Sequence, residues 1–329
     1  MRLLTNDKIN KTFPGRVKGW IKVRKGRFSD EIFSNLALIS ALLIVGILLG
    51  FIIILNIDAM PAIRKFGAAF IGSSSWDPVQ ESFGALPAIY GTLLSSAIGL
   101  LIAVPISVGA AIFLMEMAPP WLRNPASFLI EMLSALPSVI IGLWGLFVLV
   151  PFVRVHIESW LGNNLGFLPL FQGPPFGVGF LSAGIILAIM IIPIITAMSR
   201  EAIRAVPNEQ REAMLALGAT RWETIRRVVL PYCRSGLTGA IILGLGRALG
   251  ETMAVTMVIG NNYSLTASLF SPGSTIASKI ADEFNEATGE VFIGSLIELA
   301  LVLFAVTLIV NVAARFLVWR MTTMKTAKE

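Results

Sequence analysis

Six long apolar runs constrain this chain more than any other feature of its sequence. A bilayer core about 30 Å thick requires roughly 20 apolar residues in a helix. The stretches that meet this requirement are 33–55, 88–113, 126–153, 178–198, 233–260 and 292–319. Because the chain is 55% hydrophobic and only 14% charged, a membrane is its expected solvent. The sequence therefore predicts an all-α polytopic membrane protein with six transmembrane helices.

Basic residues gather on one side of the predicted spans, and this bias sets their orientation. Nine Lys and Arg residues precede the first span, whereas the loop 56–87 carries two. The loop 199–232 and the C-terminal end are basic, whereas the loops 154–177 and 261–291 carry one basic residue each. We therefore expect both termini in the cytosol. The net charge of +6 is then a topogenic signal and a contact with membrane lipid, not a sign of nucleic-acid binding.

This topology divides the chain into three parts. Residues 1–31 form a basic cytosolic tail, residues 32–320 a transmembrane domain with a cytosolic loop at 199–231, and residues 321–329 a cytosolic C-terminal tail. Cys233 is the only cysteine, so no disulfide can form within the chain. We therefore expect the packing of apolar helices, and not a disulfide, to stabilise the fold.

Three prolines lie inside the predicted spans. Pro105, Pro137 and Pro193 each remove a helical hydrogen bond, so we expect a local break in the helix at each of them. Such breaks occur at solute sites and also in ordinary membrane helices.

The cytosolic loop has the pattern of two short helices joined by a sharp turn. The first helix begins near Asn208 and ends at Gly218, which is expected to adopt a left-handed cap. Thr220 and Glu223 form a capping-box pattern for a second short helix that ends near Leu230. Apolar residues at helical spacing would form a ridge that fits a cleft of another protein, or would pack on the chain's own bundle. These residues are Ala213, Met214, Leu217, Trp222, Ile225 and Val229.

Within this loop the sequence resembles the permease subunits of ATP-binding-cassette importers. Their signature is Glu-Ala-Ala, three residues, Gly, nine residues and then Ile-x-Leu-Pro. The matching positions are Glu212, Ala213, Met214, Gly218, Val228, Leu230 and Pro231. Met214 and Val228 depart from the signature but keep its helix propensity and hydrophobic character. The resemblance implies a type I importer permease fold with cytosolic coupling helices. The residues Glu212, Ala213, Gly218, Leu230 and Pro231 would form the loop that docks in a groove on the ATPase.

Four further segments resemble the phosphate permeases of the PstC type. They are FGALPAIYGTLLSS from Phe83, the following IAVPISVGAAIFL, SALPSVIIGLWG from Ser134 and GLGRALGETMAV from Gly244. The resemblance extends from about Phe83 to the last span. It implies a multi-pass permease of the bacterial cytoplasmic (inner) membrane that carries inorganic phosphate from a binding protein into the cytosol. The same machine for molybdate, sulfate or phosphonate is a close alternative, and an ion-coupled secondary transporter or channel is a more distant one.

The resemblance also implies partners and an external source of energy. The partners are a second homologous permease subunit, an ATP-binding-cassette ATPase dimer and an extracytosolic phosphate-binding protein. Since no G-x-x-x-x-G-K-[ST] sequence occurs in this chain, we expect no enzymatic activity and no cofactor here, and we expect ATP and Mg²⁺ in the ATPase. The single histidine, His156, falls in a predicted loop with no cysteine or second histidine nearby, so we expect no metal site.

Four charged residues are predicted inside the spans, away from the basic flanks: Glu131, Arg247, Glu251 and Glu298. An ionised side chain at the centre of a membrane helix costs ~2.5–3.5 kcal/mol on insertion scales, so it normally faces protein, water or a solute path. A structural role is favoured for Glu131 and Glu298. Arg247 and Glu251, one turn apart on one face of the fifth span, are expected to line the substrate pathway. The alternative is a purely structural i,i+4 ion pair.

Overall fold

Six helices of the structure are long and apolar enough to cross a membrane, which confirms the predicted number of spans. The structure is a computed structural model that describes residues 27–326. The six candidate spans are Ile32–Asp58, Leu86–Met117, Ser138–Leu165, Phe180–Arg204, Arg221–Leu249 and Glu290–Phe316. The chain divides into two compact units, Met1–Ile52 and Ile53–Glu329, and each is described by itself.

The first unit contains most of helix α1 (Arg27–Asp58). No part of its most apolar stretch is buried, and large apolar side chains such as Phe33 and Leu42 are exposed. A helix that is apolar all round is suited to lipid on every side. The predicted basic tail 1–31 lies almost entirely outside the described residues, as do the last three residues of the predicted tail 321–329.

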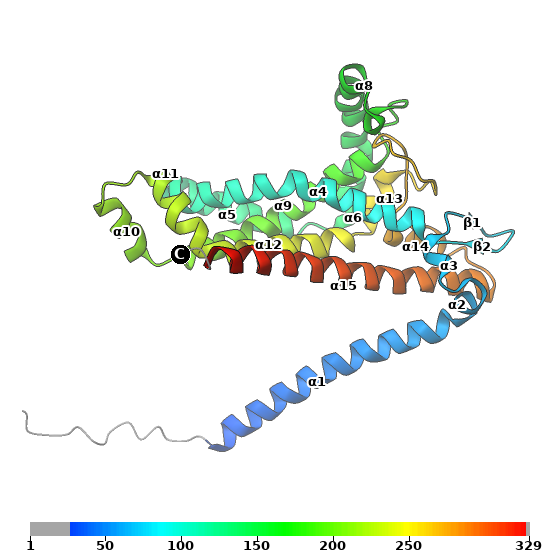
Figure 1. The fold of residues 1–329 in the computed structure, drawn as a ribbon, viewed down its shortest axis with the longest axis horizontal. Helices are drawn as coiled ribbons and strands as arrows, with labels where there is room; N and C mark the ends of the chain where they lie inside the picture. Colours follow the sequence, from blue (N-terminus) through cyan, green and yellow to red (C-terminus); the bar gives the residue numbers. More distant parts are fainter. Residues whose placement is uncertain (1–26, 327–329) are drawn as a thin grey trace, which may run out of the picture. The chain divides into compact units, whose positions relative to one another are not determined.

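The second unit is organised around helix α9 (Phe180–Arg204), which packs most extensively on α4 (Leu86–Ile112) and next on α12 (Leu230–Leu249). Glycines allow these helices to approach closely. A Cβ on Gly184 would come within 2.3 Å of the Ile98 side chain. A Cβ on Gly244 would come within 2.6 Å of the Ile195 side chain. The first contact joins α9 to α4 and the second joins α12 to α9, and Figure 1 shows α12 running alongside α9.

Two of the three expected proline breaks are absent from the described helices. Helix α4 continues through Pro105 and α9 continues through Pro193, so the prediction was wrong at these two positions. Hydroxyl groups supply hydrogen bonds where α4 and α9 meet, since the carbonyl of Ile192 accepts one from Ser107 Oγ at 3.2 Å and another from Thr196 Oγ1 at 2.7 Å. These bonds do not replace the ones that the prolines remove, which would have ended on Leu101 O and Ile189 O, so the close packing of α4 on α9 is what keeps both helices continuous.

The third proline does interrupt the helix, as predicted, and the third span consequently begins later than predicted. The apolar run 126–153 does not form one helix, because α5 (Pro120–Ser134) ends before Pro137 and a new helix begins at Ser138. Proline has no N–H and disfavours a helical residue before it. The span then continues to Leu165. Its segments are α6 (Ser138–Trp144), η2 (Gly145–Leu149), α7 (Val150–Phe152), η3 (Val153–Glu158) and α8 (Ser159–Leu165).

This shift changes the positions of two residues. Glu131 lies on α5, outside the third span, with a side chain that is 57% exposed. His156 lies in η3 and not in a loop, and its ring stacks on Phe152 at 4.7 Å between centroids. The turn-rich segment that follows includes the short 3₁₀ helix η4 (Pro169–Phe171).

The fifth span also differs from its prediction, because it begins earlier and ends earlier than 233–260. It consists of α11 (Arg221–Thr224), η5 (Ile225–Val229) and α12, which join into one helix from Arg221 to Leu249. The π-helical turn η5 ends two residues before Pro231, and the helix continues through the proline. After a break at 250–252, α13 (Met253–Ile259) follows.

Short elements and aromatic rings close one end of the second unit. They comprise a two-stranded hairpin, β1 (Trp76–Asp77) with β2 (Ser82–Phe83), and the helices α2 (Met60–Phe66), α3 (Ala69–Gly72) and α14 (Ile276–Glu283). They pack on α4 and on the start of α15 (Glu290–Thr326). Figure 1 shows this end opposite the end that carries α10 (Asn208–Ala216) and α11.

A buried lysine ties this aromatic end together. The Lys279 side chain is 6% exposed and forms an ion pair with Glu283 at 2.6 Å. Its Nζ lies 5.2 Å from the ring centroid of Trp76 and 4.8 Å from that of Tyr263. Trp76 Nε1 also donates to Glu283 at 2.6 Å, and Tyr263 donates to the carbonyl of Gly84 at 2.5 Å. Burial raises the pKa of Tyr263, so its hydroxyl keeps the proton that it donates.

Candidate coupling loop and transport groove

The turn after α10 has the geometry that the sequence predicts. Gly218 has φ +83°, a left-handed conformation that costs a residue with a Cβ about 1–2 kcal/mol. The Gly218 N–H donates to Leu215 O at 3.0 Å, and the Ala219 N–H donates to Met214 O at 3.1 Å. A Cβ on Gly218 would have no other atom within 4 Å. The requirement for glycine therefore comes from the backbone conformation alone, and the predicted left-handed cap is confirmed.

The capping box at the start of α11 is also confirmed. Thr220 Oγ1 accepts from the Glu223 N–H at 3.3 Å, and a Glu223 carboxylate oxygen accepts from the Thr220 N–H at 2.9 Å. These reciprocal bonds satisfy N–H groups that the first helical turn leaves without partners. The helix that starts here does not end near Leu230, as predicted, but runs into the membrane span.

The predicted apolar ridge divides into an exposed part and a buried part. Leu217 is 85% exposed and Trp222 is 60% exposed. Ile225 and Val229 are 2% and 0% exposed, because they lie in the bundle of this chain. Of the two alternatives for the ridge, packing on the chain's own bundle therefore holds for Ile225 and Val229. Continuation of α11 into α12 places Val229 in a core cluster with Ile203 and its neighbours.

The residues of the signature lie in two adjacent places. Glu212 and Ala213 are exposed on α10, and Gly218 forms the exposed turn after it. Leu230 and Pro231 lie further along, at the start of α12, where Leu230 is half-buried and Pro231 is exposed. At the α10 end, Glu212, Ala213 and Gly218 are thus all exposed to solvent.

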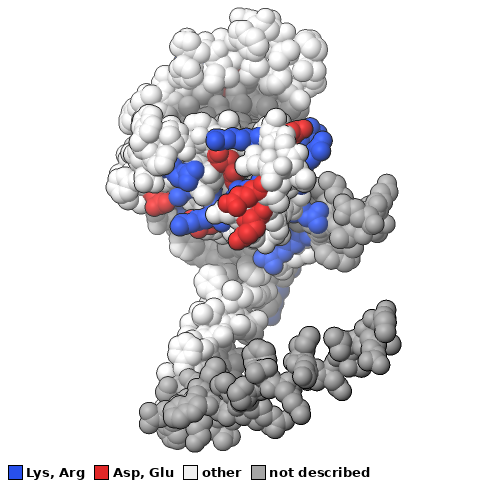
Figure 2. Space-filling model, turned by 90° about the vertical axis from the view of Figure 1, so that its left-hand side faces the viewer, with Lys and Arg blue, Asp and Glu red and all other residues white. Residues whose placement is uncertain are grey.

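Charged side chains of both signs crowd this same end, which Figure 2 views face on. Ion pairs at this end join Arg200 to Glu131 at 3.4 Å and Arg211 to Glu116 at 2.9 Å. The C-terminal part of α15 returns to this end of the second unit. The loop and the C-terminal helix are therefore on one side, as the distribution of basic residues predicts.

A groove of ≈ 770 Å³ lies between α9, α12 and α15. Most of its wall is apolar or glycine, and its polar contributors are two arginines and one asparagine. The lining residues are Ile194, Gly239, Ile242, Leu243, Gly246, Arg247, Leu308, Asn311, Val312 and Arg315. A groove that follows two membrane helices and offers guanidinium groups is suited to an anion.

Arg247, the predicted pathway residue, is exposed and lines this groove. Within residues 32–316, for which side chains are described, it has no hydrogen-bond or ion-pair partner. Its five N–H donors are thus free to meet a ligand.

Glu251 does not occupy the place predicted for it. Helix α12 ends at Leu249, so Glu251 falls in the break before α13 and not one helical turn beyond Arg247. Among the described side chains no ion pair joins Arg247 to Glu251. The prediction of a shared helical face was wrong because α12 ends at Leu249, with Gly250 as its C-cap, before Glu251 is reached.

Arg315 and Asn311 are residues of the groove that sequence reasoning missed. Arg315 was counted only among the basic residues that set the topology. Its position inside the predicted last span 292–319 was a signal that could have been used. Asn311, four residues earlier on the same helix, supplies a polar contact at helical spacing.

The remaining charged residue of the predicted spans is Glu298 on α15. It is 8% exposed, and its Oε2 atom has no hydrogen-bond partner among the described residues. It does not line the groove. In the part of the chain that the structure describes, no cluster of three or more His, Cys, Asp or Glu residues is placed to hold a metal ion.

Six apolar spans, an exposed helical turn at one end and an anion-suited groove define a multi-pass membrane transport component. The family model "binding-protein-dependent transport system inner membrane component" matches residues 103–323. The chain belongs to this family.

Curated relatives match almost the whole chain. The phosphate transport system permease protein PstC of Haemophilus influenzae is 49% identical over 296 residues, which are 89% of this chain and 94% of that protein. PstC of Mesorhizobium japonicum is 45% identical, over 91% of this chain and 92% of that protein. A probable PstC of Methanocaldococcus jannaschii is 41% identical, over 78% and 82%.

Solved structures support the fold. A bacterial ABC transporter involved in the import of the acidic polysaccharide alginate has a TM-score of 0.55 at 17% identity, covering 90% of this chain and 99% of that one. The MetNI methionine ABC transporter has a TM-score of 0.51 at 18% identity, covering 72% and 94%. These likenesses concern the type I importer permease fold alone, which agrees with the predicted fold class.

Proposed function

We propose that this chain is the transmembrane permease subunit of an ATP-driven importer that carries inorganic phosphate into the cytosol. The observation that carries the proposal is its 49% identity, over 89% of its length, to a protein named as a phosphate transport permease. The groove adds a physical reason, because it presents guanidinium groups inside an otherwise apolar wall. An anion is the class of solute that such a groove favours.

The proposed partners follow from the same family. An extracytosolic phosphate-binding protein delivers the solute at the α14 end, and an ATP-binding-cassette ATPase dimer docks at the α10 end. A second homologous permease completes the pathway, and lipid surrounds the assembly. ATP and Mg²⁺ are bound by the ATPase. Glu212, Ala213, Gly218, Leu230 and Pro231 serve the docking of that ATPase.

In the proposed pathway, Arg247 contacts the passing phosphate. A guanidinium can donate to two phosphate oxygens at once, whereas a Lys ammonium acts as a point charge. An uncompensated arginine would hold the anion too tightly for release, and conduction requires weak binding. Glu251, in the break that follows α12, supplies a negative charge that limits trapping without an ion pair to Arg247. Arg315 and Asn311 extend the polar contacts along the groove.

The proposed orientation places both termini and α10 in the cytosol. The test uses single cysteines in a Cys233→Ser background and an impermeant thiol reagent. Asn285 and Ala216 are exposed positions near opposite ends of the second unit. Labelling of Asn285→Cys but not of Ala216→Cys in intact spheroplasts is expected, and the reverse pattern contradicts the orientation.

The substrate is tested by uptake of radiolabelled phosphate, molybdate and sulfate in a strain that lacks this chain, with and without its restoration. We expect restored uptake of phosphate and unchanged uptake of the other two anions. Restoration of molybdate or sulfate uptake in place of phosphate would assign the same machine to another oxyanion. Phosphate flux through the purified chain alone in vesicles would instead indicate transport that needs no ATPase.

A further inference from the structure

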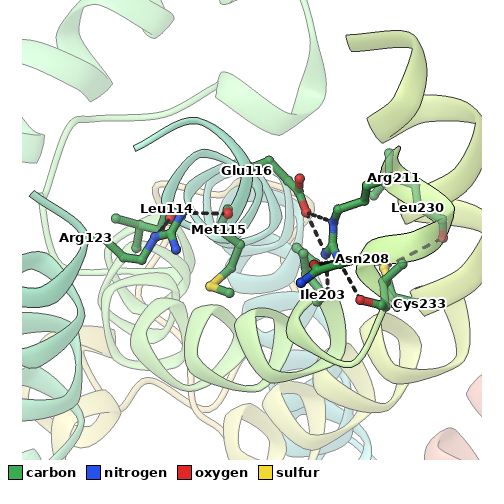
Figure 3. A network of polar contacts seen from close by, with 10 residues as sticks. Leu114, Met115, Glu116, Arg123, Ile203, Asn208, Arg211, Leu230 and Cys233 are labelled. Atoms are coloured by element: carbon green, nitrogen blue, oxygen red, sulfur yellow. Dashed lines mark hydrogen bonds and ion pairs between the residues drawn. The ribbon is translucent and has the colours of Figure 1, made fainter. Parts of the chain in front are cut away.

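Arg211, on the first turn and a half of α10, is the most heavily hydrogen-bonded side chain of the α10 end. Its Nε and Nη2 donate to Glu116 Oε1 at 3.1 and 2.9 Å. Its Nη2 also donates to Ile203 O at 2.9 Å. Its Nη1 donates to Val206 O at 2.5 Å and to Asn208 Oδ1 at 3.1 Å. Figure 3 shows the guanidinium between these groups.

The acceptors belong to three different parts of the molecule. Glu116 lies in η1 (Phe113–Met117), the last turn of the Leu86–Met117 span. Ile203 lies in the last turn of α9, and Val206 lies just after that helix. Asn208 begins α10 itself. One side chain therefore links the exposed helix to the ends of two membrane spans.

Apart from the three-residue link 205–207 that joins α10 to α9, little else attaches α10 to those spans. The helix has no buried residue, yet the Arg211 side chain is only 17% exposed and that of Glu116 only 13%. A cavity of ≈ 230 Å³, lined by Glu116, Arg211, Leu215, Arg221, Thr224 and Ile225, lies beside the pair. The connection from α10 to η1 and α9 is thus a polar contact and not a packed apolar surface.

The far side of η1 is held as well. Arg123 of α5 donates through Nε to Leu114 O at 2.7 Å and through Nη2 to Met115 O at 2.9 Å. These bonds satisfy carbonyls at the end of a helix, where no further turn exists to accept them. Hydrogen bonds therefore hold η1 from both sides, from Arg123 and from Arg211. A displacement of α10 would thus displace η1 and the end of α4 with it.

We propose that the Arg211–Glu116 pair is the joint that transmits movement of α10 to the Leu86–Met117 span and to α9. This proposal rests on the proposed function, in which the ATPase moves α10. Arg211 is a positioning residue, since it acts through other groups and does not touch the solute. A planar guanidinium with several aligned donors resists rotation, whereas a Lys ammonium cannot make the same set of bonds.

The first test measures coupling in proteoliposomes that contain the full complex, with phosphate uptake and ATP hydrolysis recorded in the same vesicles. Arg211→Gln should lower the phosphate transported per ATP hydrolysed by roughly tenfold, within the range expected for residues of a coupling network. Glu116→Gln should lower it less, because the carbonyl bonds of Arg211 remain. Arg211→Lys should retain an intermediate ratio. The matched control is Arg204→Gln, whose side chain is 72% exposed, and its ratio should equal that of the wild type.

The second test does not depend on the identity of the solute. Spin labels at Ala216→Cys on α10 and Met117→Cys on η1, both exposed positions, report the distance between the two elements in a Cys233→Ser background. With Arg211 present, we expect one narrow distance distribution with and without ATP. With Arg211→Gln or Arg211→Lys, we expect a distribution that broadens or shifts when ATP binds.

The outcomes distinguish failure of the proposed joint from failure of the proposed function. If the Arg211 variants lower uptake and hydrolysis in parallel with the amount of complex, and the labels keep their distance, the pair only stabilises the fold and the proposal is wrong. If the wild type hydrolyses ATP but imports no phosphate, the assigned solute is wrong, while the distance measurement still decides the joint.

Discussion

Two arginines of this protein have opposite surroundings. Arg211 makes five hydrogen bonds to a carboxylate, two backbone carbonyls and an amide oxygen. Arg247 lines a groove and has no partner among the side chains and backbone of residues 32–316. A guanidinium whose donors are all satisfied by protein groups fixes structure, whereas one without protein partners can bind water or a solute. Residue type alone does not separate the two roles.

Loss of Arg247 should have the largest effect on transport. Arg247→Ala removes the guanidinium from the groove, and uptake of phosphate should fall to background while the complex still assembles. Arg247→Lys should retain little uptake, because an ammonium cannot contact two oxygens in the same way. Arg64→Ala, at an exposed arginine outside the groove, is the control and should transport normally. Normal uptake by Arg247→Ala would contradict the solute-binding role that distinguishes Arg247 from Arg211.

Gly218→Val should have the next largest effect. A β-branched residue at φ +83° is strained by more than the ~1–2 kcal/mol that the left-handed region costs an ordinary residue. The turn should open and α10 should lose its docking position, so uptake should fall roughly tenfold per 1.4 kcal/mol of lost docking energy. Gly218→Asn should be milder, since Asn tolerates this conformation. Co-purification of the ATPase with both variants measures docking, and equal yields for Val and wild type would contradict the expectation.

The exposed and buried parts of the apolar ridge should respond differently. Leu217→Ser and Trp222→Ser change side chains that are 85% and 60% exposed, so they should weaken ATPase binding several-fold with the amount of folded chain unchanged. Ile225→Ser places a hydroxyl where the side chain is 2% exposed, so it should lower the amount of folded chain instead. Membrane yield and ATPase pull-down distinguish the two classes. Loss of folded chain in the Leu217 variant would show that this residue packs inside.

Arg315→Ala should have the smallest effect of the series. Arg315 shares the groove with Arg247 but lies near the cytosolic end of the predicted span 292–319, where we expect water to screen its charge. We expect a two- to fivefold rise in the solute concentration needed for half-maximal uptake, with the maximal rate little changed. A loss as complete as that of Arg247→Ala would make Arg315 an equal member of the pathway.

The sequence predicted the features of this molecule that depend on neighbouring residues. Apolar length identified six spans, and the residues Gly218, Thr220 and Glu223 predicted a turn and a cap that the structure contains. Both kinds of feature are local, because a left-handed glycine or a capping box involves only a few consecutive residues.

The features that sequence reasoning missed depend on contacts between distant segments. Nothing near Arg211 indicates that Glu116, 95 residues away, is its partner. The break at Pro137 was predicted from the proline, but hydropathy did not give the start of the third span at Ser138 or the helix end at Leu249, and both bounds were misplaced. The groove required knowledge that α12 and α15 are neighbours.

The most direct test of the central claim is phosphate uptake by the double variant Arg247→Leu, Glu251→Leu in vesicles that contain the complete complex. If Arg247 contacts the solute, the variant should assemble with its ATPase and import no phosphate, because two apolar side chains leave the groove without its central donor. If the two charges only stabilise the bundle, apolar replacement should be tolerated. Assembly without uptake is the predicted result, and substantial phosphate uptake by the double variant would contradict the account.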